Sequence, residues 1–247
     1  MKNKTPEFWD EIISTIPVCI ELEKNWIKIR DEYLVQDSHN NNNTTDSITR
    51  FSVPKFAISN RGQIDKESSR EATTPDSARE GNEKLHDGVW EGFAAGTMPK
   101  EDINVQWANT NYIRKVLKWK TKRTIPEHLE DSRKKFPTFN KIVNEFADEG
   151  QCSGAFYSLV KPGTTINPHF GADEHMRCHL SLINDPKCIL TVGDKSRTWE
   201  EGKILAFKDG RPYMHSVRHN GDKDRLVLFF DFDMTYLRAR FPDIEGL

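Results

Sequence analysis

Three histidines in the C-terminal half of the chain are the residues whose chemistry and placement suggest a site: His169, His179 and His215. His169 follows a proline- and glycine-rich turn region, and His215 lies between two later segments of strand-like sequence. Imidazole nitrogens bind iron, zinc, copper and nickel. Because strands distant in sequence can be neighbours in a barrel, His169 and His215 predict a metal site, although the pair alone does not identify the metal.

The position two residues after His169 differs from the usual non-haem iron pattern. Such sites commonly hold the metal with two histidines and one carboxylate. This chain has Gly171 at that position, and Asp173 is the nearest acid. On spacing alone, two histidines are more often ordinary structural residues than a metal site.

Several other polar residues also admit a structural interpretation. His179 can be a hydrogen-bonded core residue, and Arg225 can open a strand and pair with Asp222 or Asp224 across a turn. The segment Trp199-Glu200-Glu201-Gly202 fits a turn that closes two strands. These alternatives stand beside any functional role for the same residues.

From residue 151 onward, short apolar segments alternate with turn signals. In RCHLSLI, residues 177–183, apolar and polar side chains alternate, which places Arg177 and His179 on one face of a strand. Short strands at this spacing after a helical first half predict a β-sandwich or barrel supported by helices. The expected strands cover residues 153–160, 177–183, 188–193, 203–207 and 225–232.

The first half of the chain has the pattern of helices and loops. Apolar residues recur at spacings of three and four over residues 7–34, and Pro17 predicts a break between a short helix and a longer one over 18–34. Polar composition predicts loops elsewhere. The expected loops are residues 38–47 and 60–88, and a helical stretch over 126–150 is expected to break at Pro137, with its second helix over 138–148.

Composition limits the setting and the partners. The 247 residues carry a net charge of −2, from 36 basic and 38 acidic side chains, so a mixed-sign surface is expected, with no nucleic acid or anionic membrane as the main partner. The four cysteines form no CxxC pair, and neither a secretion signal nor an apolar membrane segment is visible. We therefore expect a cytoplasmic protein with a single domain over residues 1–247, helical and loop-rich to about 150, with a barrel core over about 151–236.

Five segments, taken in order, resemble the aspartyl/asparaginyl β-hydroxylase family of iron(II)- and 2-oxoglutarate-dependent oxygenases: SLVKPGTTINPHFG, RCHLSLI, TWEEGKILAFKDG, HSV and DRLVLFFDF. The N-terminal LEKNWIKIRDEYL is similar to the family's first helix. The resemblance covers residues 18–34 and 136–236 and is weak over 35–125. It implies a mixed α+β fold built on a double-stranded β-helix, a jelly-roll or cupin-like barrel with supporting N-terminal helices.

The resemblance implies an iron site without a carboxylate. In that family two histidines hold the metal and a glycine takes the third position, so His169 and His215 match the iron ligands and Gly171 becomes an expected feature. The implied reaction hydroxylates an unactivated C–H bond with iron(II), 2-oxoglutarate and dioxygen, and releases succinate and CO2.

Four further residues match the family's co-substrate positions. Arg225 and Ser158 match groups that bind the distal carboxylate of 2-oxoglutarate, which a guanidinium can hold bidentately. His179 and Arg177 match polar groups that line the co-substrate and substrate side.

The substrate is not readable from the sequence. An amino acid, a peptidyl Asp or Asn, or a related small molecule all fit, and the family's second substrate arginine is replaced by His175. The weakly matching residues 35–125 are expected to shape the substrate cleft, and Trp90 either lines that cleft or belongs to the core. Two alternatives are a halogenase that binds halide at the position left vacant by Gly171, and a non-catalytic barrel that binds a carboxylate. The oligomeric state stays open.

Overall fold

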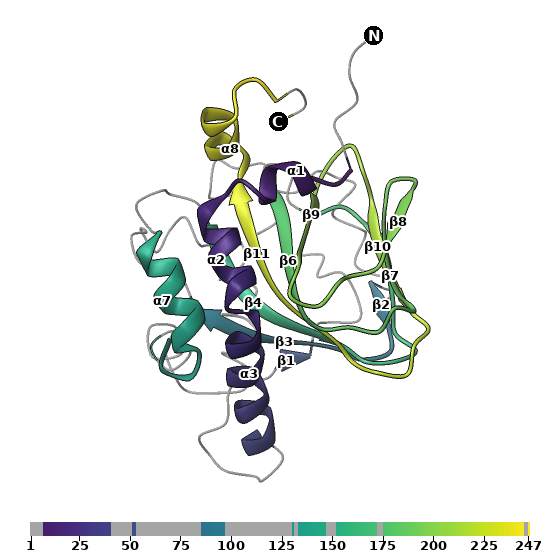
Figure 1. The fold of residues 1–247 in the computed structure, drawn as a ribbon. Helices are drawn as coiled ribbons and strands as arrows, with labels where there is room; N and C mark the ends of the chain where they lie inside the picture. The colour runs from purple at the N-terminus through teal and green to yellow at the C-terminus, as the bar shows by residue number, and fades with distance from the viewer. Residues whose placement is uncertain are drawn as a thin grey trace, which may run out of the picture.

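The computed structural model describes residues 7–40, 51–52, 85–96, 130, 133–146, 152–171, 175–244 and 247. Its strands form two sheets that face each other, and helices pack on the outside of one of them (Figure 1). The six-stranded sheet has the order β1 (Phe51–Ser52), β3 (Trp90–Gly96), β4 (Cys152–Val160), β11 (Arg225–Asp233), β6 (His175–Ile183) and β9 (Ile204–Lys208). The five-stranded sheet has the order β2 (His86–Asp87), β5 (Thr165–His169), β10 (His215–His219), β7 (Cys188–Val192) and β8 (Lys195–Arg197).

The chain crosses from one sheet to the other at almost every step between β4 and β11. Strands β4, β6, β9 and β11 belong to the larger sheet, whereas β5, β7, β8 and β10 belong to the smaller one. Each described strand pairing is antiparallel. This alternation is the jelly-roll arrangement, so the predicted mixed α+β fold with a cupin-like barrel is confirmed.

Side chains of the six-stranded sheet alternate between two separate cores. On β6, Cys178 and Leu180 enter an outer core between this sheet and the helices, whereas Arg177 and His179 lie on the opposite, barrel side. On β11, Leu228 faces the outer core while its neighbour Val227 belongs to a smaller barrel core between the sheets. The predicted alternation is thus confirmed, and it leaves the barrel side free to carry polar groups.

Three helices cover the outer face of the large sheet: α1 (Asp10–Ile13), α2 (Pro17–Lys24) and α3 (Trp26–Asn40). Pro17 begins α2, where its missing N–H is not needed. The prediction of one helix over 18–34 was wrong, because Asn25 leaves the helical conformation and its side-chain amide donates to the Glu21 carbonyl. Such a local side-chain bond competes with the helix.

The polar loops were also predicted too broadly. Residues 38–40 belong to α3, so the segment predicted as a loop over 38–47 begins in a helix. Likewise, residues 86–87 form β2 rather than a loop. Residues 41–47 and 60–84 of these ranges lie outside the described residues, as do residues 97–129.

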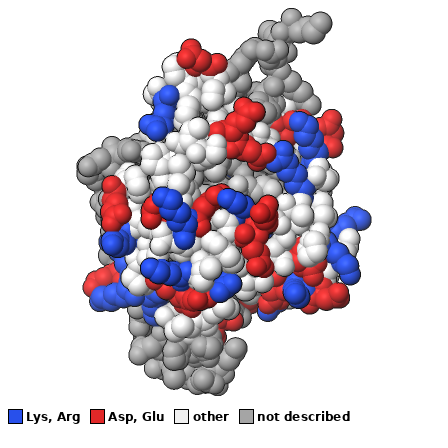
Figure 2. Space-filling model, viewed as in Figure 1, with Lys and Arg blue, Asp and Glu red and all other residues white. Residues whose placement is uncertain are grey.

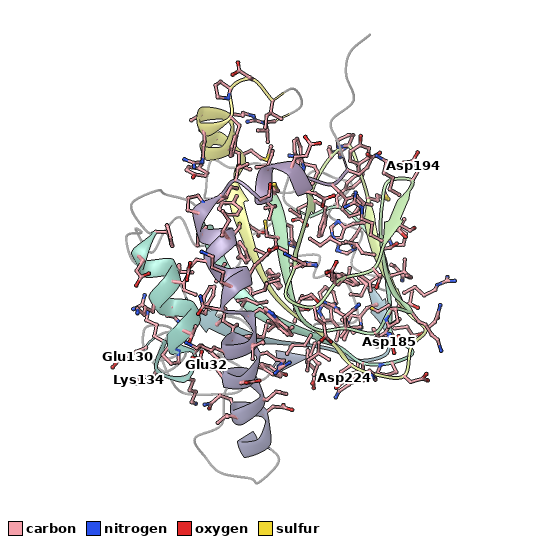
Figure 3. The ribbon with its side chains drawn as sticks, viewed as in Figure 1. Glu32, Glu130, Lys134, Asp185, Asp194 and Asp224 are labelled. Atoms are coloured by element: carbon pink, nitrogen blue, oxygen red, sulfur yellow. The ribbon has the colours of Figure 1, made fainter. Side chains whose placement is uncertain are left out.

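A separate helix, α7 (Pro137–Glu145), begins at the predicted break. In its first turn, the backbone N–H of Thr138 donates a hydrogen bond of 3.0 Å to the carboxylate of Glu32, which belongs to α3 and is labelled in Figure 3. The first N–H groups of a helix have no partner within the helix. Glu32 therefore joins two helices and caps one of them.

The ends of the chain and the surface complete the domain. The backbone N–H of Trp9 donates to the Ala206 carbonyl, so the N-terminal segment covers the edge of β9. At the other end, β11 runs into α8 (Met234–Arg240).

Lysine and arginine side chains are interspersed with acidic ones over the face that Figure 2 shows. Within the described ranges, every helix falls short of the length and apolarity that a bilayer crossing requires.

Asp185 ties together two loops at one end of the barrel (Figure 3). Its carboxylate accepts hydrogen bonds from the backbone N–H groups of Lys187, Asp222 and Lys223, at 2.8 to 3.0 Å. A side chain at Gly221 would overlap with this carboxylate. The three backbone donors lower the pKa of Asp185 to about 2.

We expect Asp185→Asn to lower the midpoint of thermal unfolding at pH 7, because a neutral amide replaces a carboxylate with three donors. The folded-state pKa lies below the unfolded value of about 3.9. The stabilisation is therefore complete above that value and is lost as the pH falls toward 2. Urea titrations between pH 7 and pH 2 should show the difference from wild type shrinking only below about pH 4. Asp194→Asn, at an exposed turn, is the matched control; a constant difference for Asp185→Asn would contradict the assignment.

Candidate active site

Two histidines meet across the small sheet. His169 ends β5 and His215 begins β10, and the two residues are direct partners in the antiparallel pairing. Their ring centroids are 4.2 Å apart. The structure therefore brings together the two residues that the sequence singled out as metal ligands, while metal binding itself stays a prediction.

Both imidazoles are held in the neutral form that a metal requires. His169 Nδ1 lies 2.8 Å from the Asn167 carbonyl oxygen, and since a carbonyl only accepts, Nδ1 carries the hydrogen and Nε2 keeps its lone pair. Burial, followed by the neighbouring His215, lowers the pKa of His169 to about 3. Burial, followed by the Arg177 guanidinium, lowers the pKa of His215 to about 3.

Asp209 is a site residue that the sequence analysis missed. It follows β9, is fully buried, and places Oδ1 at 3.6 Å from His215 Nε2. A Cβ atom at Gly171 would overlap with the Asp209 carboxylate, and the Gly171 N–H donates to the Asp209 carbonyl at 2.8 Å. The carboxylate thus fills the space where a side chain at position 171 would stand. In the sequence, Asp209 carried only a turn signal.

Arg177 connects this carboxylate to a second one. Its Nε and Nη2 donate to the two oxygens of Asp231, at 2.8 and 2.9 Å, and its Nη1 lies 3.1 Å from Asp209 Oδ1. Burial opposes the charge on Arg177, but Asp209 and Asp231 outweigh that effect and raise its pKa above the ordinary value. Arg177, predicted as a co-substrate residue, therefore lies at the histidine end with its fork engaged by carboxylates.

Within the described residues, no group of three or more His, Cys, Asp or Glu side chains is arranged to hold a metal ion. The histidine pair is accordingly a two-residue arrangement with Asp209 beside it. Asp173, the acid nearest to Gly171 in sequence, lies outside the described residues.

A second cation is buried deeper in the barrel. Arg225 opens β11, exposes only 2% of its surface and stacks on the Trp199 ring, with Cζ 4.9 Å from the ring centroid. Its hydrogen bond goes to the Cys188 thiol, and Nε and Nη1 have no hydrogen-bond partner among the described residues. The alternative pairing with Asp222 or Asp224 is wrong, because Asp224 pairs with Lys161 and the exposed Asp222 lies near Lys187. Burial lowers the pKa of Arg225.

Ser158 and Trp90 line the same part of the barrel. Trp90 Nε1 donates to Ser158 Oγ at 2.9 Å, which leaves the serine hydroxyl hydrogen available for another acceptor. Trp90 packs against the barrel core, so it lies in the interior rather than in the outer core. Together with Arg225 and Trp199, these residues form what we call the Arg225 cluster.

His179 lies between the Arg225 cluster and the histidine pair. Its Nδ1 accepts a hydrogen bond from Trp199 Nε1 at 3.2 Å. On its other side its ring contacts Phe207, centroid to centroid at 5.2 Å, and Phe207 contacts His215 at 5.3 Å. Burial, then the charges of Arg225 and Arg177, hold the pKa of His179 well below its usual value. A neutral aromatic wall thus connects the two polar ends of the interior.

Comparison with known proteins places these features in a family. A family model described as aspartyl/asparaginyl beta-hydroxylase matches residues 23–235. The Mus musculus aspartate beta-hydroxylase domain-containing protein 2 is 37% identical over 81 residues, which cover 31% of this chain and 23% of that protein. The Mus musculus aspartyl/asparaginyl beta-hydroxylase is 31% identical over 106 residues, 41% of this chain and 14% of that protein. The matched segments thus span less than a quarter of these relatives' own lengths.

Among solved structures, the Schizosaccharomyces pombe Cnp3 cupin domain is similar with a TM-score of 0.29 and 12% identity. The likeness covers 36% of this chain and 61% of that one. The jelly-roll assignment rests instead on the order of the strands in the two sheets.

We expect Gly171→Ala to destabilise the fold by about 1–3 kcal/mol, because the new methyl group must displace the Asp209 carboxylate from Arg177. In the background Asp209→Ala the same substitution should cost much less, since the overlapping atoms are gone. Urea unfolding of the four proteins in this double-mutant cycle measures the coupling. Additive effects would show that Gly171 and Asp209 do not share this space.

Proposed function

Because the chain belongs to the aspartyl/asparaginyl β-hydroxylase family, we propose that it hydroxylates an unactivated C–H bond with iron(II), 2-oxoglutarate and dioxygen, and releases succinate and CO2. The substrate class is an amino acid, a peptidyl Asp or Asn, or a related small molecule. The residues matched to the metal and co-substrate positions, among them His169, His215 and Arg225, lie on β5, β10 and β11 of the barrel.

The observation that carries the proposal is the buried, uncompensated guanidinium of Arg225. A buried cation without an opposite charge beside it is strongly unfavourable, and among the described residues no carboxylate pairs with Arg225. An anion that enters the barrel would satisfy Nε and Nη1 together, and a carboxylate matches that fork. The distal carboxylate of 2-oxoglutarate would bind the Arg225 guanidinium, with the Ser158 hydroxyl as a second donor.

The histidine pair fits the metal. His169 and His215 would hold iron(II) through neutral imidazoles, with the His169 tautomer set by Asn167. When bound, iron(II) supplies the oxidation chemistry through 2-oxoglutarate and dioxygen. The protein's own part is to orient and to shelter: Arg225 holds the co-substrate's far end, and the aromatic wall of His179 and Phe207 excludes water between the two ends.

The charged residues at the histidine end keep that site in place. Asp231 holds the Arg177 fork, and Arg177 holds the Asp209 carboxylate beside His215. Two carboxylates and one guanidinium leave a net negative charge there, which favours a divalent cation. The cation at the other end of the barrel favours an anion. Opposite charges at the two ends orient a co-substrate that must bind metal with one end and arginine with the other.

The geometry does not favour the two alternatives. A halogenase needs room for a halide at the position that Gly171 leaves vacant, and the Asp209 carboxylate lies in that space. A barrel that only binds a carboxylate would need Arg225 but not two facing histidines with low pKa values. The His175 side chain, which replaces a family arginine, lies outside the described side chains, so it adds nothing to the choice of substrate.

We expect His169→Ala and His215→Ala each to lower succinate formation more than about 100-fold, since even outer-sphere partners of metal ligands account for 10- to 100-fold. The assay measures succinate released with iron(II), 2-oxoglutarate and dioxygen, and metal content is measured on the same samples. His219→Gln is the matched control, because His219 lies on the same strand but bonds the Lys223 carbonyl. Turnover retained in both alanine variants would refute the proposal.

Arg225→Lys should raise the KM for 2-oxoglutarate by about 10- to 100-fold, because lysine keeps the charge but loses two fixed donors. The kcat at saturating co-substrate should change much less. Initial rates over a range of 2-oxoglutarate concentrations separate the two parameters. Arg218→Lys, on the exposed face of β10, serves as the control. An unchanged KM in Arg225→Lys would remove Arg225 from the site.

A further inference from the structure

One polar group in the barrel has no role in the function proposed above: the hydroxyl of Ser181. Ser181 lies on β6, is fully buried at 0% exposure, and its Oγ has no hydrogen-bond partner among the described residues. Its neighbours Leu180 and Leu182 belong to the outer core, so Ser181 shares the barrel side with Arg177 and His179. A buried hydroxyl that makes no hydrogen bond carries a desolvation penalty, and such groups call for a missing partner.

The strand register places this residue beside the Arg225 cluster. Val227 of β11 is paired with Ser158 of β4 on one side and with Ser181 of β6 on the other. Arg225 is the preceding barrel-facing residue of β11, and diagonal neighbours in a sheet are within reach of long side chains. The two serines therefore flank the strand that carries Arg225.

We propose that Ser181 is a further donor to the distal carboxylate of 2-oxoglutarate, an inference that rests on the proposed function. A carboxylate has two oxygens with about four acceptor positions. It can accept the fork of Arg225 together with hydroxyl hydrogens from Ser158 and Ser181. One ligand then satisfies Ser181 Oγ and Arg225 Nε and Nη1, which have no hydrogen-bond partner among the residues that the structure describes. The same donors would discriminate against 2-oxo acids without a second carboxylate.

The sharpest test compares ligand binding with ligand-free stability in Ser181→Ala. Without ligand the hydroxyl is unsatisfied, so its removal should leave the unfolding midpoint unchanged or raise it. With Mn(II) in place of iron(II), calorimetric titration should show 2-oxoglutarate binding about tenfold weaker than in wild type, as expected for one lost hydrogen bond to a charged group. The affinity for Mn(II) alone should not change.

Two further variants complete the design. Ser181→Cys keeps the side-chain shape but has a weak donor, so it should show the same loss of affinity even if the alanine variant folds poorly. Ser196→Ala is the matched control, because this serine bonds Thr191 on the exposed surface of β7 and β8. It should bind 2-oxoglutarate as the wild type does.

The outcomes separate this inference from the proposed function. Wild type and both Ser181 variants binding 2-oxoglutarate equally would overturn the role of Ser181 alone. A lower ligand-free midpoint with unchanged affinity would likewise show a structural serine. Failure of the wild type to bind 2-oxoglutarate at all would overturn the proposed function and, with it, this inference.

Discussion

The pairing of β5 with β10 is the contact on which the candidate site depends. It sets His169 opposite His215, and β10 is held in that register by β7 on its other side. Because side chains alternate along a strand, a slip of one residue would turn His215 away from its partner. Such a slip is opposed by Val217, two residues along β10, because its side chain is anchored in the barrel core. The arrangement of the two histidines is thus a consequence of sheet pairing rather than of local sequence.

The barrel treats its two buried arginines in opposite ways. Arg177 is neutralised by Asp231 and Asp209, and this network stiffens the histidine end. Arg225 instead contacts the Trp199 ring and the Cys188 thiol, and its Nε and Nη1 have no hydrogen-bond partner among the described residues. An arginine whose charge is neutralised by carboxylates of the protein has little charge left to attract a ligand. An arginine without a carboxylate beside it can still bind an incoming anion. The barrel therefore holds one arginine that carboxylates of the protein neutralise and one that we propose to bind an anion.

The outer core stabilises a fold that carries two arginines on the barrel side of the large sheet. Helices α2 and α3 and the outward side chains of β6 and β11 bury a large apolar cluster, and each fully buried Leu or Ile in it contributes roughly 1.5–3 kcal/mol. That cluster lies on the opposite face of the same strands that carry Arg177, His179 and Arg225. Stability and chemistry thus occupy the two faces of one sheet, and substitutions inside the barrel can be tested without removing the outer core.

No strand was expected over β5, β8 or β10, although β5 and β10 carry His169 and His215. Local patterns in the sequence did determine β4, β6, β7, β9 and β11, the alternation on β6, the helix break at Pro17 and the ordered residues that suggest a histidine pair and a co-substrate arginine. These features depend on neighbours within a few residues, so periodicity and motifs carry them. Only the tertiary structure decided that Asp209 fills the space beside Gly171, that Asp231 holds Arg177, that Trp90 bonds Ser158, and that Ser158 and Ser181 both pair with Val227. Each of these contacts joins strands distant in sequence, and the register of long-range pairing, which no local period encodes, sets which side chains meet. The break at Asn25 was missed for the opposite reason: a single side-chain hydrogen bond overrode a helical pattern that continued on both sides.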